Sequence, residues 1–150
     1  MSEHKATLQW KRQSTDFVYE TYDRGHKVGF PGGQNLQNSA APAFFGKAEL
    51  TNPEELLAAS LGTCHMLTFL AVACKSRFVV DSYEDEAVAV LEKNEAGKMA
   101  VTKIYLRPKV RFSGTAPDAA KLQELHNKAH HNCMIGNSLK TQVIVEAQNP

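Results

Sequence analysis

The sequence predicts an α+β fold in which antiparallel sheets pack against helices. Three observations carry this prediction: short segments that alternate between apolar and polar residues, a long apolar helix over 53–76, and a shorter amphipathic helix over 116–133. Strands, a helix, a hairpin, a second helix and a closing strand follow one another without a repeat or a linker. Because 150 residues suffice for one domain with its own core, we expect a single domain over 1–150.

The first third of the chain is predicted to be extended. Residues 6–12 and 16–23 alternate in the manner of strands, and the segment "HKVGF" runs into "PGGQN", which is typical of a turn. Residues 34–50 lack a clear period and are expected to form a loop. These segments predict strands and a loop ahead of the long helix.

The long helix has clear signals at its start. Asn52 is a suitable N-cap, Pro53 suits the first helical position, and Glu54 and Glu55 lie in the first turn, where the helix dipole favours anions. Asn52 and Glu55 also have the spacing of a capping box. We therefore expect the helix to begin at Pro53.

The second half of the chain predicts a hairpin, a helix and a strand. Two long strands flank the turn signal "NEAG", and the second of them covers 101–112, where Pro108 indicates an edge position or a bulge. Leu122, Leu125 and Ala129 form one stripe of the second helix, and "TQVIVEA" is the closing strand.

The composition disfavours several classes of function. The formal net charge is +1, with 17 basic and 16 acidic residues and no block of like charge, so binding to nucleic acid or to an anionic membrane is not expected. The first residues lack the apolar core of a secretory signal, which favours a cytoplasmic protein. The apolar helix approaches the length of a membrane span, but polar residues such as Ser60 and His65 interrupt it, so a buried helix is expected.

The chain has three cysteines, an odd number that disfavours a disulfide scaffold and directs attention to a reactive thiol. Cys64 stands in the middle of the apolar helix, where it is either a small core residue or a thiol in an apolar pocket. Cys133 lies in the polar segment "HHNCMIGNSL" and Cys74 near the end of the long helix.

A thiolate needs a nearby cation, because an apolar surrounding alone favours the protonated thiol. Arg24 and Arg12 are the candidate cations and Glu54 is a candidate carboxylate. On an ideal helix Glu54 and Cys64 lie about 80° apart around the axis and roughly 15 Å apart along it, so they cannot touch. An arginine from another segment could hold the carboxylate while facing the sulfur.

Two other arrangements remain open. His126 and His130 share one helical face and Cys133 follows, a spacing that can hold a zinc ion, although no second pair of ligands reinforces it. A Cys-His hydrolase is also conceivable, but Cys64 and His65 point about 100° apart on a helix, so His65 is badly placed to activate its neighbour. Phosphate-binding glycine motifs are absent from the sequence.

The segment "TNPEELLAASLGTCHMLTFLAVA" strongly resembles the first cysteine motif of the OsmC/Ohr family, the osmotically inducible and organic hydroperoxide resistance proteins. The segment "CMIGNSL" is similar to the second motif, and the order of elements matches over nearly the whole chain. By this resemblance Cys64 corresponds to the peroxidatic cysteine, Cys133 to the resolving cysteine, Glu54 to the glutamate at the helix start, and Arg24 to the arginine that pairs with the thiolate. Arg12 is the alternative cation. Met134 stands where the family often has proline, which leaves the backbone beside Cys133 less constrained.

The resemblance implies a thiol-dependent peroxidase without a metal or an organic cofactor. Cys64 would attack an organic hydroperoxide and become a sulfenic acid, Cys133 would condense with it to a disulfide, and a dithiol such as a lipoylated protein would reduce that disulfide. The family also implies an intertwined homodimer. The alternative is a non-catalytic protein of the same fold that binds a small apolar ligand, or a metal through His126, His130 and Cys133.

Overall fold

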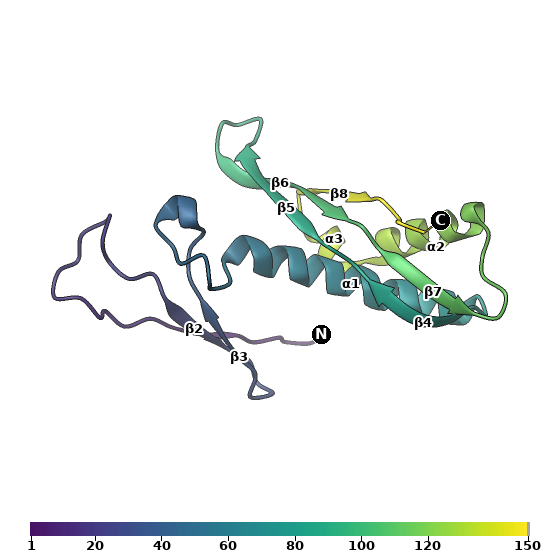
Figure 1. Ribbon diagram of the computed structural model, residues 1–150, viewed down its shortest axis with the longest axis horizontal. Coiled ribbons are helices and arrows are strands. Elements are labelled where there is room, and N and C mark those ends of the chain that lie inside the picture. Colours follow the sequence, from purple (N-terminus) through teal and green to yellow (C-terminus); the bar gives the residue numbers. More distant parts are fainter. Residues whose placement is uncertain (150) are drawn as a thin grey trace. The chain divides into compact units, whose positions relative to one another are not determined.

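The computed structural model describes residues 1–149, which form two compact units, one from Met1 to Leu56 and the other from Leu57 onwards. The division falls inside the long helix α1 (Pro53–Lys75), after its first turn. Figure 1 labels the elements of both units.

The first unit contains a three-stranded antiparallel sheet. Its strands are β1 (Thr7–Gln9), β2 (His26–Gly29) and β3 (Asn35–Asn38), in the order β1-β2-β3. The predicted turn between β2 and β3 is confirmed, and Gly33 has a φ of 83°, a left-handed value that favours glycine. A short 3₁₀ turn, η1 (Pro42–Phe44), follows β3.

Two predictions for the first unit are wrong. Residues 16–23 form bends and turns and not a strand, because their aromatic side chains pack on one another: the ring centroids of Phe17 and Tyr22 are 5.0 Å apart, and both rings contact Trp10. The expected loop over 34–50 contains β3, since its polar side chains gave no alternation to recognise.

The predicted start of α1 is confirmed. The Asn52 side chain accepts a hydrogen bond from the N–H of Glu55 at 3.0 Å, and the Glu55 carboxylate accepts one from the N–H of Asn52 at 3.2 Å. This reciprocal pair is a capping box built on asparagine. It fixes the first turn of α1 and with it the place of Glu54.

The second unit contains two sheets. β4 (Val79–Glu84) pairs with β7 (Lys109–Ser113), while β5 (Val88–Lys93), β6 (Met99–Leu106) and β8 (Gln142–Val145) form the other sheet, in the order β5-β6-β8. Pairing is antiparallel except between β6 and β8, which are parallel. Figure 1 shows the β5–β6 hairpin and β8 lying beside β6.

The segment 101–112 is not the single strand that its alternation predicts. Pro108 has no N–H to donate to a ladder, and the chain leaves one sheet at Leu106 and enters the other at Lys109. The proline thus marks a change of sheet and not a bulge within one strand.

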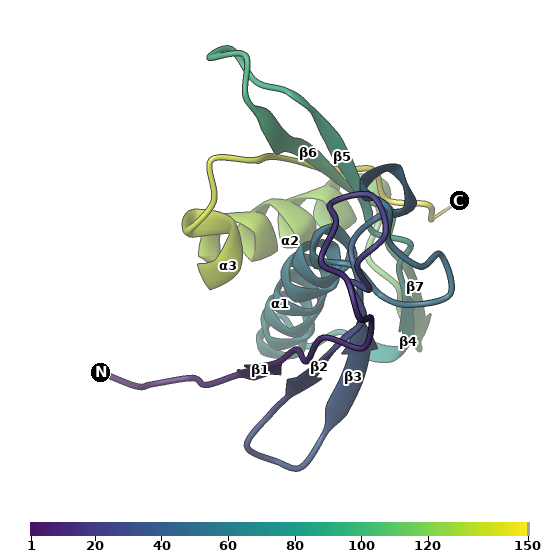
Figure 2. The same ribbon diagram turned by 90° about the vertical axis from the view of Figure 1, so that its left-hand side faces the viewer.

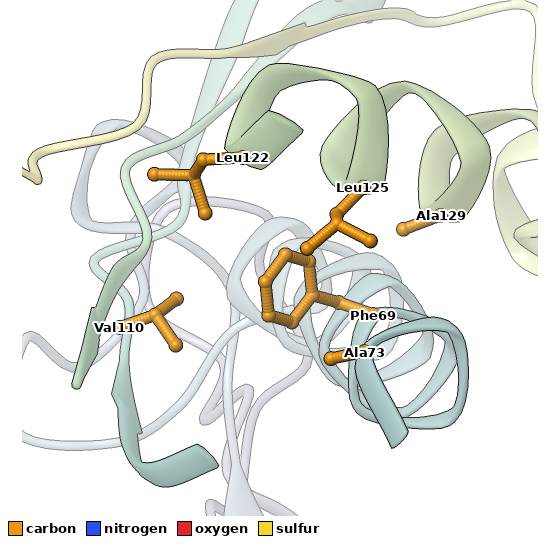
Figure 3. Packing of buried hydrophobic residues seen from close by; sticks show 6 residues of the cluster. All are labelled: Phe69, Ala73, Val110, Leu122, Leu125 and Ala129. Atoms are coloured by element: carbon orange, nitrogen blue, oxygen red, sulfur yellow. The ribbon is translucent and has the colours of Figure 1, made fainter. Parts of the chain in front are cut away.

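Two helices of the second unit share an apolar core. α2 (Ala119–Asn132) packs beside α1, and Phe69 and Ala73 of α1 meet Leu125 and Ala129 of α2 (Figures 2 and 3). Val110 of β7 closes this cluster. A second cluster joins α1 to β6 through Leu61, Ile104 and Leu106, and it ends at the short helix α3 (Met134–Asn137). These two clusters hold the middle of α1 in place.

By length and composition α1 could cross a membrane, with a mean hydropathy of 1.8 over its most apolar window. A third of that window is buried inside the molecule. Its buried side chains include Leu61, Phe69 and Ala73, which belong to the two clusters.

Candidate active site

The side chains of Cys64 and Cys133 lie together in the second unit. Cys64 stands in the middle of α1 and is half-buried, whereas Cys133 follows α2 and is 1% exposed. Both line the apolar cluster around Leu61. Both are free thiols, and Cys64 is close enough to raise the pKa of Cys133. The fold therefore brings together two cysteines that are far apart in the sequence.

The turn after α2 directs backbone N–H groups at both sulfurs. Cys133 ends α2 and caps α3, and its Sγ accepts a hydrogen bond from the N–H of Gly136 at 3.3 Å. The N–H of Ile135 donates to Cys64 Sγ at 3.5 Å. Met134 is the first residue of α3, a position at which proline is favourable, and the turn forms with methionine there.

Cys133 is held in its protonated form. Burial raises the pKa of the Cys133 thiol, and the neighbouring Cys64 side chain raises this pKa further. Negative charge on Cys64 acts in the same direction, whereas the N–H groups of Gly136 and Ile135 lower the pKa of Cys133. The raised pKa therefore favours the protonated thiol of Cys133 near neutral pH.

Glu54 lies at the start of α1, in the first unit. Its side chain is half-buried, and its Oε2 atom is buried without a hydrogen-bond partner among residues 1–149. A buried carboxylate oxygen without a donor is costly. Glu54 therefore has one oxygen free to accept a bond from a donor that the described contacts of the chain do not supply.

Arg24 is 8% exposed and is held within the first unit. Its guanidinium donates to the carbonyl oxygens of Tyr22, at 2.9 Å, and Tyr19. The guanidinium carbon lies 3.9 Å from the centre of the Tyr22 ring and 5.3 Å from those of Tyr19 and Phe45. Aromatic faces attract a cation, so Arg24 is a fixed positive charge in an apolar setting.

The described geometry does not join the four predicted residues into one cluster. Arg24 and Glu54 belong to the first unit and form no ion pair within residues 1–149, while Cys64 and Cys133 belong to the second. Arg12, the alternative cation, is exposed and donates to carbonyl oxygens of its own loop.

A hollow of about 480 Å³ lies beside Arg24 in the first unit. Aromatic side chains form much of its wall, together with the guanidinium of Arg24; its lining residues include Trp10, Phe17, Tyr19, Tyr22, His26 and Phe44. Sequence reasoning missed this hollow. The signal that could have found it is the concentration of aromatic residues over 10–22, a segment that was instead interpreted through its alternation.

The apolar residues around Cys64 differ in their surroundings. Leu61 and Phe69 are fully buried in the two clusters of the second unit, whereas Leu67 is 63% exposed. Met66 lines a smaller hollow of about 280 Å³ with Tyr83 and other side chains of the second unit. Cys74 is exposed near the end of α1 and does not belong to the cluster that holds Cys64 and Cys133.

The histidines of α2 do not assemble a metal site in the described part of the chain. No group of three or more His, Cys, Asp or Glu side chains within residues 1–149 is placed to hold an ion. His126 turns inward and is hydrogen-bonded to His65, with 3.2 Å between His65 Nε2 and His126 Nδ1, whereas His130 is exposed. The proposed set of His126, His130 and Cys133 is therefore not supported.

Comparison with known proteins agrees with the predicted family. The model of the OsmC-like protein family matches residues 46–148. The peroxiredoxin OsmC of Escherichia coli is 31% identical over 98 residues, which are 65% of this chain and 66% of that protein. The alignment thus spans just under two thirds of the length of this curated relative.

Solved structures extend the likeness to the whole chain. An OsmC-like protein of unknown function from Vibrio cholerae is 44% identical, with a TM-score of 0.93 over 98% of this chain and 99% of that one. An organic hydroperoxide resistance protein from Elizabethkingia anophelis is 18% identical, with a TM-score of 0.76 over 100% of this chain and 98% of that one, which shows a shared fold. The chain belongs to the OsmC-like family, as its two cysteine motifs and its order of elements predict.

Proposed function

We propose that the protein is a thiol-dependent peroxidase that reduces organic hydroperoxides to alcohols. The observation that carries this proposal is that Cys64 and Cys133 line one cluster, with Cys133 buried, Cys64 more exposed, and Cys64 Sγ hydrogen-bonded to the turn that follows Cys133. A peroxidatic cysteine must be accessible and must ionise, while a resolving cysteine must lie within bonding reach. Relatives named peroxiredoxin and organic hydroperoxide resistance protein support the same class of reaction.

The proposed cycle has three steps. The Cys64 thiolate attacks the distal oxygen of the hydroperoxide, the O–O bond breaks, and the alkoxide leaves as an alcohol after taking up a proton, so Cys64 becomes a sulfenic acid. Cys133 then attacks the sulfur of that sulfenic acid, a disulfide forms, and water leaves. A dithiol, such as a dihydrolipoyl group on a protein, reduces the disulfide by exchange and becomes a disulfide itself. The cycle uses no metal or organic cofactor.

Arg24 and Glu54 are proposed to act on the first step. Arg24 would favour the Cys64 thiolate, since a guanidinium stays charged at any working pH. Glu54 would orient the guanidinium through its buried oxygen. The guanidinium has five N–H donors and the bonds to the carbonyl oxygens of Tyr19 and Tyr22 use two of them, so donors remain for the carboxylate.

A homodimer is proposed as the working form, with residues 1–150 acting as one OsmC/Ohr-like domain in each copy. Large apolar side chains are exposed across the first unit, among them Leu8, Trp10, Phe17 and Phe45, and α1 adds Leu67. Exposed apolar patches of this kind are typical of interaction surfaces.

We propose that the protein works in the cytoplasm, where reduced thiols and dithiol reductants are available.

Organic hydroperoxides are the proposed substrates, in preference to hydrogen peroxide. The aromatic hollow beside Arg24 offers apolar surface to an organic tail. Each buried methylene contributes about 0.8 kcal/mol, so a tail of a few carbons suffices for a large preference. Equal second-order rate constants for hydrogen peroxide and cumene hydroperoxide would argue against this role of the hollow.

The proposal is tested by following cumene hydroperoxide in the presence of dihydrolipoamide. We expect wild-type protein to consume peroxide through many turnovers and Cys64→Ser to consume none. Cys74→Ser, a matched change in the same helix, is the control and should turn over like the wild type. Wild-type turnover in Cys64→Ser would refute the proposal.

A non-catalytic, ligand-binding protein of the same fold is the second candidate, and the aromatic hollow with its buried cation favours it. Such a protein would bind a small apolar ligand beside Arg24, and its free thiols would be unchanged after organic peroxide. Counting free thiols before and after one equivalent of cumene hydroperoxide separates the two candidates, because the peroxidase loses two thiols per chain.

A further inference from the structure

The contact between His65 and His126 lies outside the proposed chemistry. Both side chains are fully buried, at 0% and 1% exposure, and their rings are parallel to within 6°. His65 Nε2 and His126 Nδ1 lie 3.2 Å apart, and the ring of Phe69 stacks on His126 with 4.3 Å between ring centres. An apolar core does not require two imidazoles at its centre, so the pair calls for an explanation.

Within the described part of the chain, the pair leaves two buried nitrogen atoms without a partner, as Tyr83 and Asp85 of the same unit each leave one oxygen. The outer ring nitrogens, His65 Nδ1 and His126 Nε2, are buried without a hydrogen-bond partner among residues 1–149. Buried polar atoms are nearly always paired, and an unpaired one lowers stability. A gain in conformational specificity is the attested reason for keeping such polar groups in a core.

The place of the pair connects it to the two sulfurs. His65 is the residue after Cys64 on α1, and His126 lies about two turns before Cys133, along α2. Helical backbone is stiff over these spans. Whatever fixes His126 relative to His65 therefore also fixes the position of Cys133 relative to Cys64.

The other contacts between these helices are less selective. Phe69 and Ala73 meet Leu125 and Ala129 through apolar surface, and apolar contact has no preferred direction (Figure 3). A hydrogen bond weakens steeply as its distance and angle depart from the ideal. A disulfide is also demanding, because its two Cβ atoms must approach to about 3.8 Å.

We propose that His65 and His126 are positioning residues that set the register of α2 on α1 and so hold Cys133 within bonding reach of Cys64. Their hydrogen bond acts on disulfide formation and not on peroxide attack. Burial lowers the pKa of both histidines to about 4, so the pair is neutral near neutral pH and its bond is not weakened by charge repulsion. This inference rests on the proposed function for its biological meaning, but the geometry that it concerns exists without peroxide.

The first test measures the effective concentration of the two thiols by equilibration with oxidised and reduced glutathione, in a Cys74→Ser background. One oxidised glutathione converts the two protein thiols to a disulfide and yields two reduced glutathiones. We expect His126→Leu to lower the effective concentration about tenfold or more, because the bond is lost while the apolar volume remains. His126→Asn places a side-chain amide where the Nδ1 atom of His126 stood, and His65→Gln places one where the Nε2 atom of His65 stood. Each amide can replace the lost hydrogen bond, so the effective concentration in both variants should stay within about threefold of the wild type. An unchanged value in His126→Leu overturns the proposal.

His130→Leu is the matched control, since it removes an exposed histidine from the same helix. We expect it to leave the effective concentration unchanged. An equal loss in His130→Leu and His126→Leu overturns the proposal, because it would point to a general effect on α2. Equal losses in His126→Leu and His126→Asn also overturn it, since the second variant keeps a polar partner for His65.

The second test separates the two steps with one equivalent of cumene hydroperoxide. In His126→Leu we expect sulfenic acid to form within about threefold of the wild-type rate and the disulfide to follow about tenfold more slowly. A fall of both rates by the same factor overturns the proposal. Absence of sulfenic acid from the wild type as well would overturn the proposed function alone, because the glutathione measurement does not depend on peroxide.

Discussion

The two units of the chain bury different kinds of side chain. In the first unit, the buried residues among those described are Val28 together with the polar or charged Arg24, Asn38, Ser39 and Asn52. The second unit buries two apolar clusters, and its fully buried polar side chains are the paired His65 and His126. The second unit thus has a core of its own, whereas the first surrounds a cation with aromatic rings.

Because of this difference, we expect the second unit to determine mainly the stability of the chain and the first unit mainly its activity. Apolar burial is the main favourable term in folding, so the second unit must supply most of the stability of the chain. The first unit contributes charge and aromatic surface. Changes in the second unit should therefore appear first in unfolding, and changes around Arg24 should appear first in turnover.

The largest expected effect is a loss of stability in acid, caused by the second unit. Above pH 6.5 His65 and His126 are neutral in both the folded and the unfolded chain and make no contribution. As the pH falls from 6.5 toward 4, the unfolded chain takes up protons that the folded one does not, because burial lowers the pKa of each histidine to about 4 in the fold. Since one pKa unit corresponds to about 1.4 kcal/mol, we expect the free energy of unfolding to drop by several kcal/mol.

Urea unfolding between pH 7 and pH 4 measures this drop. The double variant His65→Gln, His126→Asn has no titrating group at the pair, so it should lose less stability over the same range. His130→Gln should behave like the wild type, since His130 is exposed. If the free energy of unfolding falls equally with pH in the wild type and the double variant, the two histidines do not titrate as stated.

The next effect compares two phenylalanines, one from each unit. Phe69 is 0% exposed between α1 and α2, and Phe17 is 66% exposed in the first unit. Phe69→Ala should lower the free energy of unfolding by about 3–5 kcal/mol, because it leaves a cavity in the core. Phe17→Ala should lower it by less than about 1 kcal/mol. Similar losses in urea unfolding would erase the contrast between the two units.

The third effect concerns turnover in the first unit. Arg24→Ala should reduce the second-order rate constant for organic peroxide about a hundredfold or more, because the thiolate loses its counter-charge. Arg24→Lys retains the charge but not the planar fork and should lose about tenfold. Glu54→Ala should lose less than Arg24→Ala, since it removes orientation and not the cation.

The control for this series is Arg12→Ala, which removes an exposed arginine of the same unit. It should turn over like the wild type. The pH dependence of Cys64 alkylation, in a Cys74→Ser, Cys133→Ser background, identifies the cation directly. If the pH dependence of alkylation shifts to higher pH in Arg12→Ala and does not shift in Arg24→Ala, Arg12 is the cation that stabilises the thiolate.

The smallest effect is a gain in stability at the turn after α2. Met134 is 75% exposed at the first position of α3, and Cys133 before it has an extended backbone that suits a following proline. Met134→Pro should raise the free energy of unfolding by about 0.4–1 kcal/mol, by restricting the unfolded chain. A loss of stability in thermal or urea unfolding would show that proline strains this turn.

The sequence predicted the second unit better than the first, and the reason is physical. The turn at "NEAG" and the stripe of α2 are local signals that the core of the second unit reinforces. In the first unit the alternation over 16–23 predicted a strand, but the rings of Tyr19 and Tyr22 pack on the buried Arg24, and Phe17 packs on Tyr22. Side chains that pack on one another within a single loop do not produce a regular spacing of apolar residues in the sequence.

The candidate site was predictable in its residues but not in its geometry. The motifs that contain Cys64 and Cys133 could be recognised, whereas their meeting in one cluster and the burial of Cys133 depend on elements far apart in the chain. The partner of His126 was also out of reach, because a helical spacing that suits a metal equally suits a pairing with His65.

The central claim is that Cys64 attacks while Cys133 keeps its proton until it resolves. Its most direct test is mass spectrometry of sulfenic acid trapped with dimedone, after one equivalent of cumene hydroperoxide, in Cys133→Ser and Cys64→Ser proteins that both carry Cys74→Ser. The account predicts one adduct per chain, on Cys64, in the Cys133→Ser protein and none in the Cys64→Ser protein. An adduct on Cys133 in the Cys64→Ser protein, formed as fast as the adduct on Cys64, would contradict it.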